Sequence, residues 1–206
     1  MRLTRVSRLG MLCSLACASG GPALAQTPSP SAQIAAALLP LPGSLRAGAG
    51  VVVHDTGGQP RELRPSANGM VCFGDEPGDS IFDVECYPRS LIPLTYRMRQ
   101  LAAADMPESV LDQTIEAEVR SGKLELPTGP VASYHMWGPL SGYDWSTNTV
   151  TDTIAVWHML HMPYGTAAAM GLPTNEDGSH PYVMASGTYF AHVMIMQHPV
   201  RPCACR

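Results

Sequence analysis

The sequence contains little positive charge. Its 206 residues include 13 arginine and lysine residues against 17 aspartate and glutamate residues, and the only lysine is Lys123. Proteins that bind nucleic acids or anionic membranes do so through a clustered basic surface. The sequence has no such cluster, so we expect no nucleic-acid partner and no attraction to an acidic membrane.

Long apolar runs are missing as well. A helix needs roughly 20 consecutive apolar residues to cross a bilayer, and no segment after residue 25 approaches that length. The apolar stretch from Leu9 to Ala18 is shorter, follows three arginines and precedes Ala23-Leu24-Ala25. This arrangement is typical of a secretory signal peptide that is cleaved before Gln26. We therefore predict no transmembrane segment and a secreted or periplasmic protein.

Cleavage at this point determines the size and charge of the remaining chain. It leaves 181 of the 206 residues, and because three arginines are lost the formal net charge changes from −4 to −7. This length suits one domain with a sizeable core. A lipoprotein signal with lipidation at Cys17 is the alternative, because Ser14-Leu15-Ala16-Cys17 is similar to a lipobox. The expected parts are a signal peptide at 1–25, a tether at 26–30, one domain at 31–200 and a cysteine-containing tail at 201–206.

Four cysteines remain after cleavage. An even number in an oxidising compartment indicates disulfides, and four cysteines allow three connectivities. We favour Cys72–Cys86, which closes a loop of about 15 residues and contributes roughly 3 kcal/mol in the chain-entropy model. Cys203 and Cys205 lie in the tail, and their pairing stays open. Neither pair has the spacing of a zinc site.

The apolar pattern predicts an α+β fold, a mostly antiparallel sheet with two or three helices on one face. Asn68-Gly69 is typical of a hairpin turn, so the first strands are expected to form an antiparallel meander. Ser31 is the expected N-cap of the first helix. The predicted helices cover 31–39, 91–101, 107–122 and 166–170, and the predicted strands cover 51–53, 61–64, 70–73, 134–137, 154–162, 182–184 and 191–196.

The segment between Cys72 and Cys86 is rich in carboxylates. Calcium takes oxygen ligands, but the spacing does not match an EF-hand loop. We therefore interpret the segment as a hydrated loop closed by a disulfide, with calcium binding as the alternative. The five carboxylates are Asp75, Glu76, Asp79, Asp83 and Glu85.

Several short motifs occur in an order that resembles exported bacterial proteins of unknown function. The resemblance implies export and a single compact domain, and it implies no activity or cofactor. His192 looks like a recurring position in that pattern, whereas the His158 and His161 pair does not. The motifs are Asn68-Gly69, Cys72, Cys86, Arg120-Ser121-Gly122-Lys123-Leu124, Gly171-Leu172-Pro173-Thr174 and Ala191-His192-Val193-Met194.

Histidine and methionine are concentrated in Ile154 to Gly165. Imidazole and thioether groups are suitable ligands for Cu(I), and His158, Met159, His161 and Met162 could supply them. However, residues three apart point to opposite faces of a strand, and the β-branched and aromatic content favours a strand here. We therefore predict no cofactor, with a copper site as the alternative.

An enzymatic function has weak support. The sequence contains no Gly-x-Ser-x-Gly elbow, no His-Glu-x-x-His helix and no phosphate-binding glycine loop. A hydrolase in which a serine is activated by a histidine stays as a second alternative. Its candidate residues are Ser141, Asp144 and His192.

A non-enzymatic binding or interaction module is the leading hypothesis, and its partner is an unknown small molecule or protein. Aromatic residues are concentrated in the second half of the chain, where they can line an apolar pocket or fill the core. The residues that we expect to bind a ligand are Trp137, Tyr143, Trp145 and Tyr164, with Tyr134 and Trp157 nearby in sequence.

Overall fold

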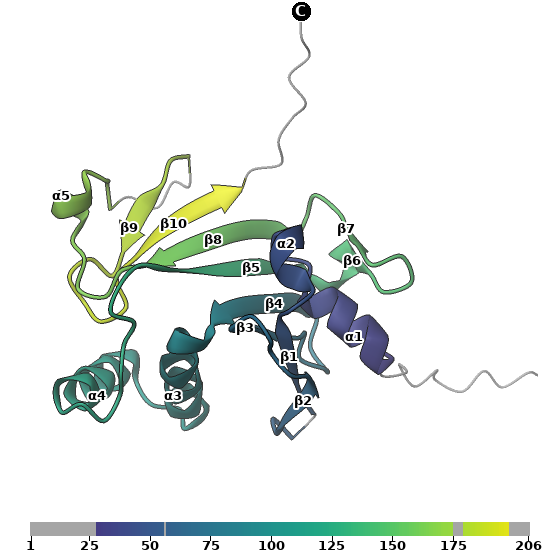
Figure 1. Ribbon diagram of the computed structural model, residues 1–206, viewed down its shortest axis with the longest axis horizontal. Helices are drawn as coiled ribbons and strands as arrows, with labels where there is room; N and C mark the ends of the chain where they lie inside the picture. The colour runs from purple at the N-terminus through teal and green to yellow at the C-terminus, as the bar shows by residue number, and fades with distance from the viewer. Residues whose placement is uncertain (1–27, 56, 175–178, 198–206) are drawn as a thin grey trace, which may run out of the picture.

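Eight strands form one mostly antiparallel sheet in the order β2-β1-β3-β4-β5-β8-β10-β9 (Figure 1). The computed structural model describes residues 28–55, 57–174 and 179–197. The predicted α+β class is confirmed. The strands of this sheet are β1 (Gly50–His54), β2 (Pro60–Arg64), β3 (Met70–Phe73), β4 (Ile81–Pro88), β5 (Val131–Pro139), β8 (Ala155–His161), β9 (Tyr182–Met184) and β10 (His192–Gln197), and a second small sheet pairs β6 (Tyr143–Asp144) with β7 (Thr149–Val150).

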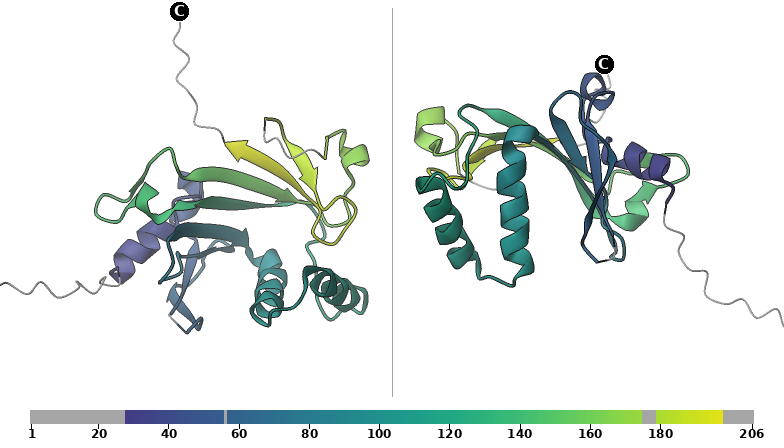
Figure 2. Two further views of the ribbon diagram at one scale, coloured as in Figure 1. Left: turned by 180° about the vertical axis from the view of Figure 1, so that it is seen from behind. Right: turned by 60° about the horizontal axis from the view of Figure 1, so that its bottom comes forward.

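The helices are distributed over both faces of the sheet (Figures 1 and 2). The first helix and the residues that follow it pack against β1, β3 and β4 through Ala37, Leu38 and Leu41. The two longest helices pack on the other face, where Leu94 and Ile115 join the cluster around Tyr87. The helical segments are α1 (Pro30–Ala37), α2 (Gly43–Arg46), η1 (Arg89–Leu91), α3 (Ile92–Ala103), α4 (Glu108–Arg120), η2 (Leu140–Gly142) and α5 (Ala167–Met170).

Alternation along β4 separates these two faces. Phe82, Val84 and Cys86 belong to the clusters that include α1 residues. Asp83 and Glu85 point the other way, because successive side chains of a strand alternate. We call the side of the sheet that contains Glu85 the α3 face. Paired residues of neighbouring strands lie on the same side of a sheet, so the register defines the rest of this face.

The predicted antiparallel meander at the start of the chain is wrong. β1 pairs antiparallel with β2, but β3 lies on the other side of β1 and pairs parallel with it. Arg64 donates to the carbonyl oxygens of Ala49 and Arg46 at 2.7 Å, which holds the chain close to β1 as it leaves β2. Asn68-Gly69 is therefore a turn, with Gly69 at φ +82°, but it joins two strands that are not neighbours.

The predicted disulfide between Cys72 and Cys86 is confirmed. The two residues face each other on β3 and β4 with their Cα atoms 4.0 Å apart. Much of the intervening segment is thus strand rather than hydrated loop. Asp83 and Glu85 belong to β4, where Asp83 pairs with Trp137 and Glu85 with His135. The hydrated-loop interpretation is wrong for these two carboxylates.

Three predicted boundaries also change. Ser29, not Ser31, caps α1, because its hydroxyl accepts from the backbone N–H of Ala32 at 3.2 Å and the helix starts at Pro30. β5 continues through Gly138 and Pro139, which still pair with β4. β8 ends at His161 rather than at residue 162. The predicted signal peptide, Gln26 and Thr27 of the predicted tether, and Cys203 and Cys205 lie outside the described residues, whereas Ser29 and Pro30 of the predicted tether begin the first helix.

Candidate functional site

A chain of polar side chains crosses three neighbouring strands on the α3 face. His135 Nδ1 lies 3.4 Å from a carboxylate oxygen of Glu85. The Ser133 hydroxyl lies 3.0 Å from His135 Nε2 and 2.9 Å from His161 Nε2. Ser133 is fully buried, and both histidines are 2% exposed. Such buried polar groups are costly unless each is satisfied, and here each contacts the next.

Arg99 of α3 closes one end of this chain. Its guanidinium donates to Glu85 at 2.7 Å and lies 4.7 Å above the ring of Phe73. Burial alone would raise the pKa of Glu85, but hydrogen bonding and charge from His135, together with Arg99, outweigh it and lower the pKa to about 2. Glu85 is therefore a carboxylate at every physiological pH.

The donors and acceptors limit the direction of the hydrogen bonds. A carboxylate only accepts, so His135 presents Nδ1–H to Glu85. The Ser133 hydroxyl lies between His135 Nε2 and His161 Nε2 and can donate to one while it accepts from the other. Burial first, and then the charges of His192 and His135, lower the pKa of His161 to about 3. His161 is thus neutral, and one of its two ring nitrogens carries a lone pair.

A cavity of about 180 Å³ lies between α3 and this face. His161 and Glu85 reach it from the polar chain. Burial, followed by the charge of Glu85, raises the pKa of Tyr87 well above its usual value, so the phenol stays protonated. The cavity therefore has a polar floor and an apolar roof. It is lined by Glu85, Tyr87, Leu91, Leu94, Thr95, Met98, Arg99, His161 and Phe190.

A second buried imidazole adjoins the cavity. The ring of His192 on β10 lies 5.4 Å from that of His161, its partner in the register. His192 Nδ1 is 2.7 Å from the backbone oxygen of Phe190. A carbonyl oxygen only accepts, so Nδ1 carries the proton and Nε2 carries the lone pair. Burial lowers the pKa of His192, which keeps this ring neutral.

The structure separates the candidate copper ligands, as the predicted strand requires, because residues 155–161 form β8. His158 contacts Gln197 at 2.6 Å and the ring of Tyr134, whereas His161 joins the polar chain on the other face. Met159 lies on the side of His161, and Met162 packs in a different cluster with Leu160. Among residues 28–55, 57–174 and 179–197, no three His, Cys, Asp or Glu side chains are grouped so as to hold a metal ion. The five carboxylates proposed for calcium therefore do not form such a group.

The four predicted ligand-binding aromatics do not surround one cavity. Tyr143 and Trp145 contact each other in the cluster around Phe82. Trp137 is 47% exposed and lies where β5 pairs with the first residue of β8. Tyr164 follows the other end of β8, is 45% exposed, and reaches the carboxylate of Glu116 at 3.4 Å.

The three predicted catalytic residues are likewise apart. Ser141 and Asp144 follow the end of β5 that pairs with Ala155. His192 pairs with His161 at the opposite end of β8. Asp144 instead accepts from the backbone and hydroxyl of Ser146 at 2.8 and 2.7 Å.

The residues that do meet were missed because they are spread over the chain. Glu85, Ser133 and His161 are separated by 48 and 28 positions, so their proximity depends on the strand order. The sequence nonetheless contains a pattern that indicates this polar chain. Polar residues at every second position, Asp83 with Glu85 and Ser133 with His135, interrupt apolar strands in phase with the sheet. Two such strands in register predict a polar stripe.

No family model matches the chain, and no curated protein or solved structure is significantly similar to it. Within the part of the chain that the structure describes, no helix has the length and apolar character needed to cross a bilayer. The Cys72–Cys86 disulfide is compatible with an extracellular location. A function therefore has to be inferred from the geometry of the α3 face.

Proposed function

We propose that this is an exported protein that binds a small, largely apolar molecule in the cavity between α3 and the sheet. The signal peptide predicted at 1–25 and the Cys72–Cys86 disulfide support export. One observation carries the binding proposal: a chain of buried polar groups ends at a partly open cavity. Apolar residues would fill this space at lower cost, since a buried ion pair is often no more stabilising than its apolar replacement.

The volume of the cavity limits the size of the ligand. A dry protein cavity of roughly 150 Å³ holds benzene, so 180 Å³ fits a molecule with a single ring. The apolar roof of Leu91, Leu94 and Met98 suits the ring. The polar floor favours one hydroxyl, because neutral His161 offers a lone pair to which a hydroxyl can donate, and the Tyr87 phenol, which hydrogen-bonds Glu85, adds a second polar group to the lining. We therefore expect a one-ring phenol or alcohol.

Phenol and toluene test this proposal as a matched pair of probes. Both fit by size, and only phenol has the hydroxyl. In isothermal titration calorimetry, phenol should bind with a dissociation constant of about 1 mM or below and toluene at least tenfold more weakly, the loss of roughly one hydrogen bond. Equal affinity for both, or no binding of either, would contradict the proposal.

Two substitutions locate the site. Met98→Trp places a larger side chain in the cavity and should abolish binding of both probes while the circular dichroism spectrum is retained. Tyr87→Phe should weaken phenol binding alone. Tyr189→Phe is the matched control, because Tyr189 is also buried but donates to Asp112 at 2.7 Å, away from the cavity. Phenol affinity that is unchanged in Tyr87→Phe would place the hydroxyl elsewhere.

A serine hydrolase is the second candidate, favoured by one observation. Glu85, His135 and Ser133 have the mutual order of a carboxylate, a base and a nucleophile, at 3.4 and 3.0 Å. This candidate ranks second because Ser133 is fully buried and does not line the cavity. A small sulfonyl fluoride should label Ser133, as located by tandem mass spectrometry, and Ser133→Ala should prevent labelling. Labelling at Ser141 or at no serine would remove this candidate.

A further inference from the structure

Methionines collect on the α3 face at the end of the sheet formed by β8, β10 and β9. Met194 pairs with Met159, and Met196 pairs with Trp157. Met184 on β9 pairs with His192. Paired positions share a face and have Cβ atoms about 5 Å apart. We call Met159, Met184, Met194 and Met196, with Trp157 and Tyr182, the methionine surface.

The methionine surface forms a cluster of its own. Met159, Met194 and Tyr182 are buried, whereas Met184, Met196 and Trp157 are partly exposed. The described residues of α3 and α4 pack in a separate cluster around Leu94 and Ile115. Two of the four thioethers are thus buried and two are partly exposed, so the cluster extends from a packed layer to solvent.

Thioether sulfur selects soft cations. It is neutral and polarisable, so it binds Cu(I) and similar ions rather than Ca²⁺ or Mg²⁺, which take oxygen. Trp157 adds an aromatic face that attracts a cation. An exported protein meets such ions outside the cytoplasmic thiol pool. Sulfur ligands from three neighbouring strands can meet one ion because the methionine side chain has three rotatable bonds.

His192 adds a nitrogen ligand to this surface. Its Nδ1–H bonds to the carbonyl of Phe190 at 2.7 Å, which leaves Nε2 with the lone pair. Metal-binding histidines commonly have this arrangement, with the second ring nitrogen held by a carbonyl or carboxylate. His192 lies opposite Met184 and two residues from Met194 on the same face. The nearest titratable groups are His161 and His135, and both are members of the polar chain.

We infer that Met159, Met184, Met194 and His192 form a site for a soft monovalent cation, Cu(I) or Ag(I). The set differs from the one predicted from sequence, because His158 and Met162 do not belong to it and β9 and β10 contribute most of its ligands. The inference is independent of ligand binding beneath α3. Met196 and Trp157 flank the four ligands.

The first test uses Ag(I), which does not change oxidation state during titration. The protein should carry Cys203→Ser and Cys205→Ser, so that thiols do not compete. In methyl-resolved NMR, one equivalent of Ag(I) should shift the ε-methyl signals of Met159, Met184 and Met194. Met136 and Met162, which pack in other clusters, should not shift. Equal shifts of all methionines, or none, would overturn the inference.

The second test measures Cu(I) affinity in anaerobic competition with a chromophoric chelator. Met159→Leu with Met194→Leu should weaken Cu(I) binding at least 100-fold, because leucine keeps the apolar volume and removes sulfur. Met136→Leu with Met162→Leu is the matched control and should change affinity less than threefold. If the first pair does not fold, Met184→Leu at its more exposed position should lower affinity at least tenfold. Unchanged affinity in the folded variants would show that the methionines pack but do not bind the ion. Binding of Ag(I) without binding of Cu(I) would exclude copper as the ligand.

Discussion

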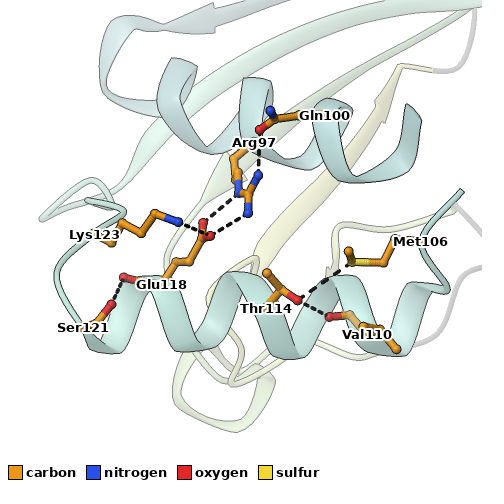
Figure 3. Close-up of polar contacts among 8 residues, drawn as sticks. All are labelled: Arg97, Gln100, Met106, Val110, Thr114, Glu118, Ser121 and Lys123. Carbon is orange, nitrogen blue, oxygen red and sulfur yellow. Dashed lines mark hydrogen bonds and ion pairs between the residues drawn. The ribbon is translucent and has the colours of Figure 1, made fainter. Parts of the chain in front are cut away.

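Helix α3 holds two glutamates through two arginines, and the two pairs differ in what lies beyond them. Arg97 donates to both carboxylate oxygens of Glu118 on α4, at 2.8 and 2.6 Å (Figure 3). Arg99, two residues later, donates to Glu85 on β4 at 2.7 Å. The pKa of each glutamate is lowered to about 2. An arginine–glutamate pair in which the glutamate pKa is lowered therefore lies on each side of α3.

The partners of Glu118 end at the surface. Hydrogen bonds from Arg97 and then from Lys123 lower its pKa, and the Lys123 side chain is 68% exposed. The partners of Glu85 continue inward through His135 to Ser133, which has no exposed surface. Glu118 is thus a clamp between two helices, whereas Glu85 starts a buried chain that ends at a cavity. A depressed pKa alone does not distinguish these roles.

The largest expected effect comes from neutralising the two glutamates separately. Glu85→Gln removes the better-buried partner of Arg99 and leaves it, among the described residues, only the exposed Glu76 at 3.2 Å, and removing one partner of a buried pair costs roughly 3–5 kcal/mol. We expect about 3 kcal/mol less stability in urea unfolding. Glu118→Gln should cost less, because Lys123 returns to water and no further buried polar group in the described part of the chain depends on Glu118. Equal losses in the two variants would contradict the distinction.

Lowering the pH should show the contribution of Glu85 to stability. The pKa of Glu85 is about 2 in the folded protein against 4.5 when unperturbed, so its contribution is complete above pH 4.5 and is lost as pH falls towards 2. The shift corresponds to about 3 kcal/mol. The stability difference between the parent protein and Glu85→Gln, measured by urea unfolding from pH 2 to 6, should shrink by about that amount. In 1 M salt the stability difference between the parent protein and Glu118→Gln should become smaller, because salt screens the interaction with Lys123, whereas the difference between the parent protein and Glu85→Gln should persist.

The sequence predicted the local elements well and the site poorly. Apolar periodicity found α3 and α4 within a few residues, and the compartment argument gave Cys72–Cys86. These signals lie within short segments. The polar chain depends on which strands are neighbours, and β5 pairs with β8 rather than with the intervening β6 and β7. The separation of His158 and His161 by the alternation of β8 was predicted, because it depends only on the local strand.

The pKa of Asp83 predicts a smaller change of stability with pH, opposite in sign to that of Glu85. Burial, and then the charge of Glu85 two residues away, raises the pKa of Asp83 to about 7 from 3.8. Its raised pKa means that stability is highest below pH 4 and falls as pH rises through 7. Asp83→Asn cannot ionise, so its advantage over the parent protein should grow from pH 4 to 8 by about 2 kcal/mol, discounted for partial solvation. Asp144→Asn, at an exposed carboxylate, should show no such growth in urea unfolding.

The smallest effect concerns the geometry of the surface clamp. Arg97→Lys keeps the charge but replaces two parallel hydrogen bonds to Glu118 by one, because an ammonium group lacks the planar fork of guanidinium. The melting temperature should fall slightly in low salt, and the difference should vanish in 1 M salt, where exposed charges are screened. Arg99→Lys should lower it further and in both salts, because Arg99 also packs over Phe73 and its partner Glu85 is connected to the buried chain. If the two variants respond alike to salt, neither the packing of Arg99 over Phe73 nor the buried chain behind Glu85 separates the two arginines, and the distinction between the two ion pairs is lost.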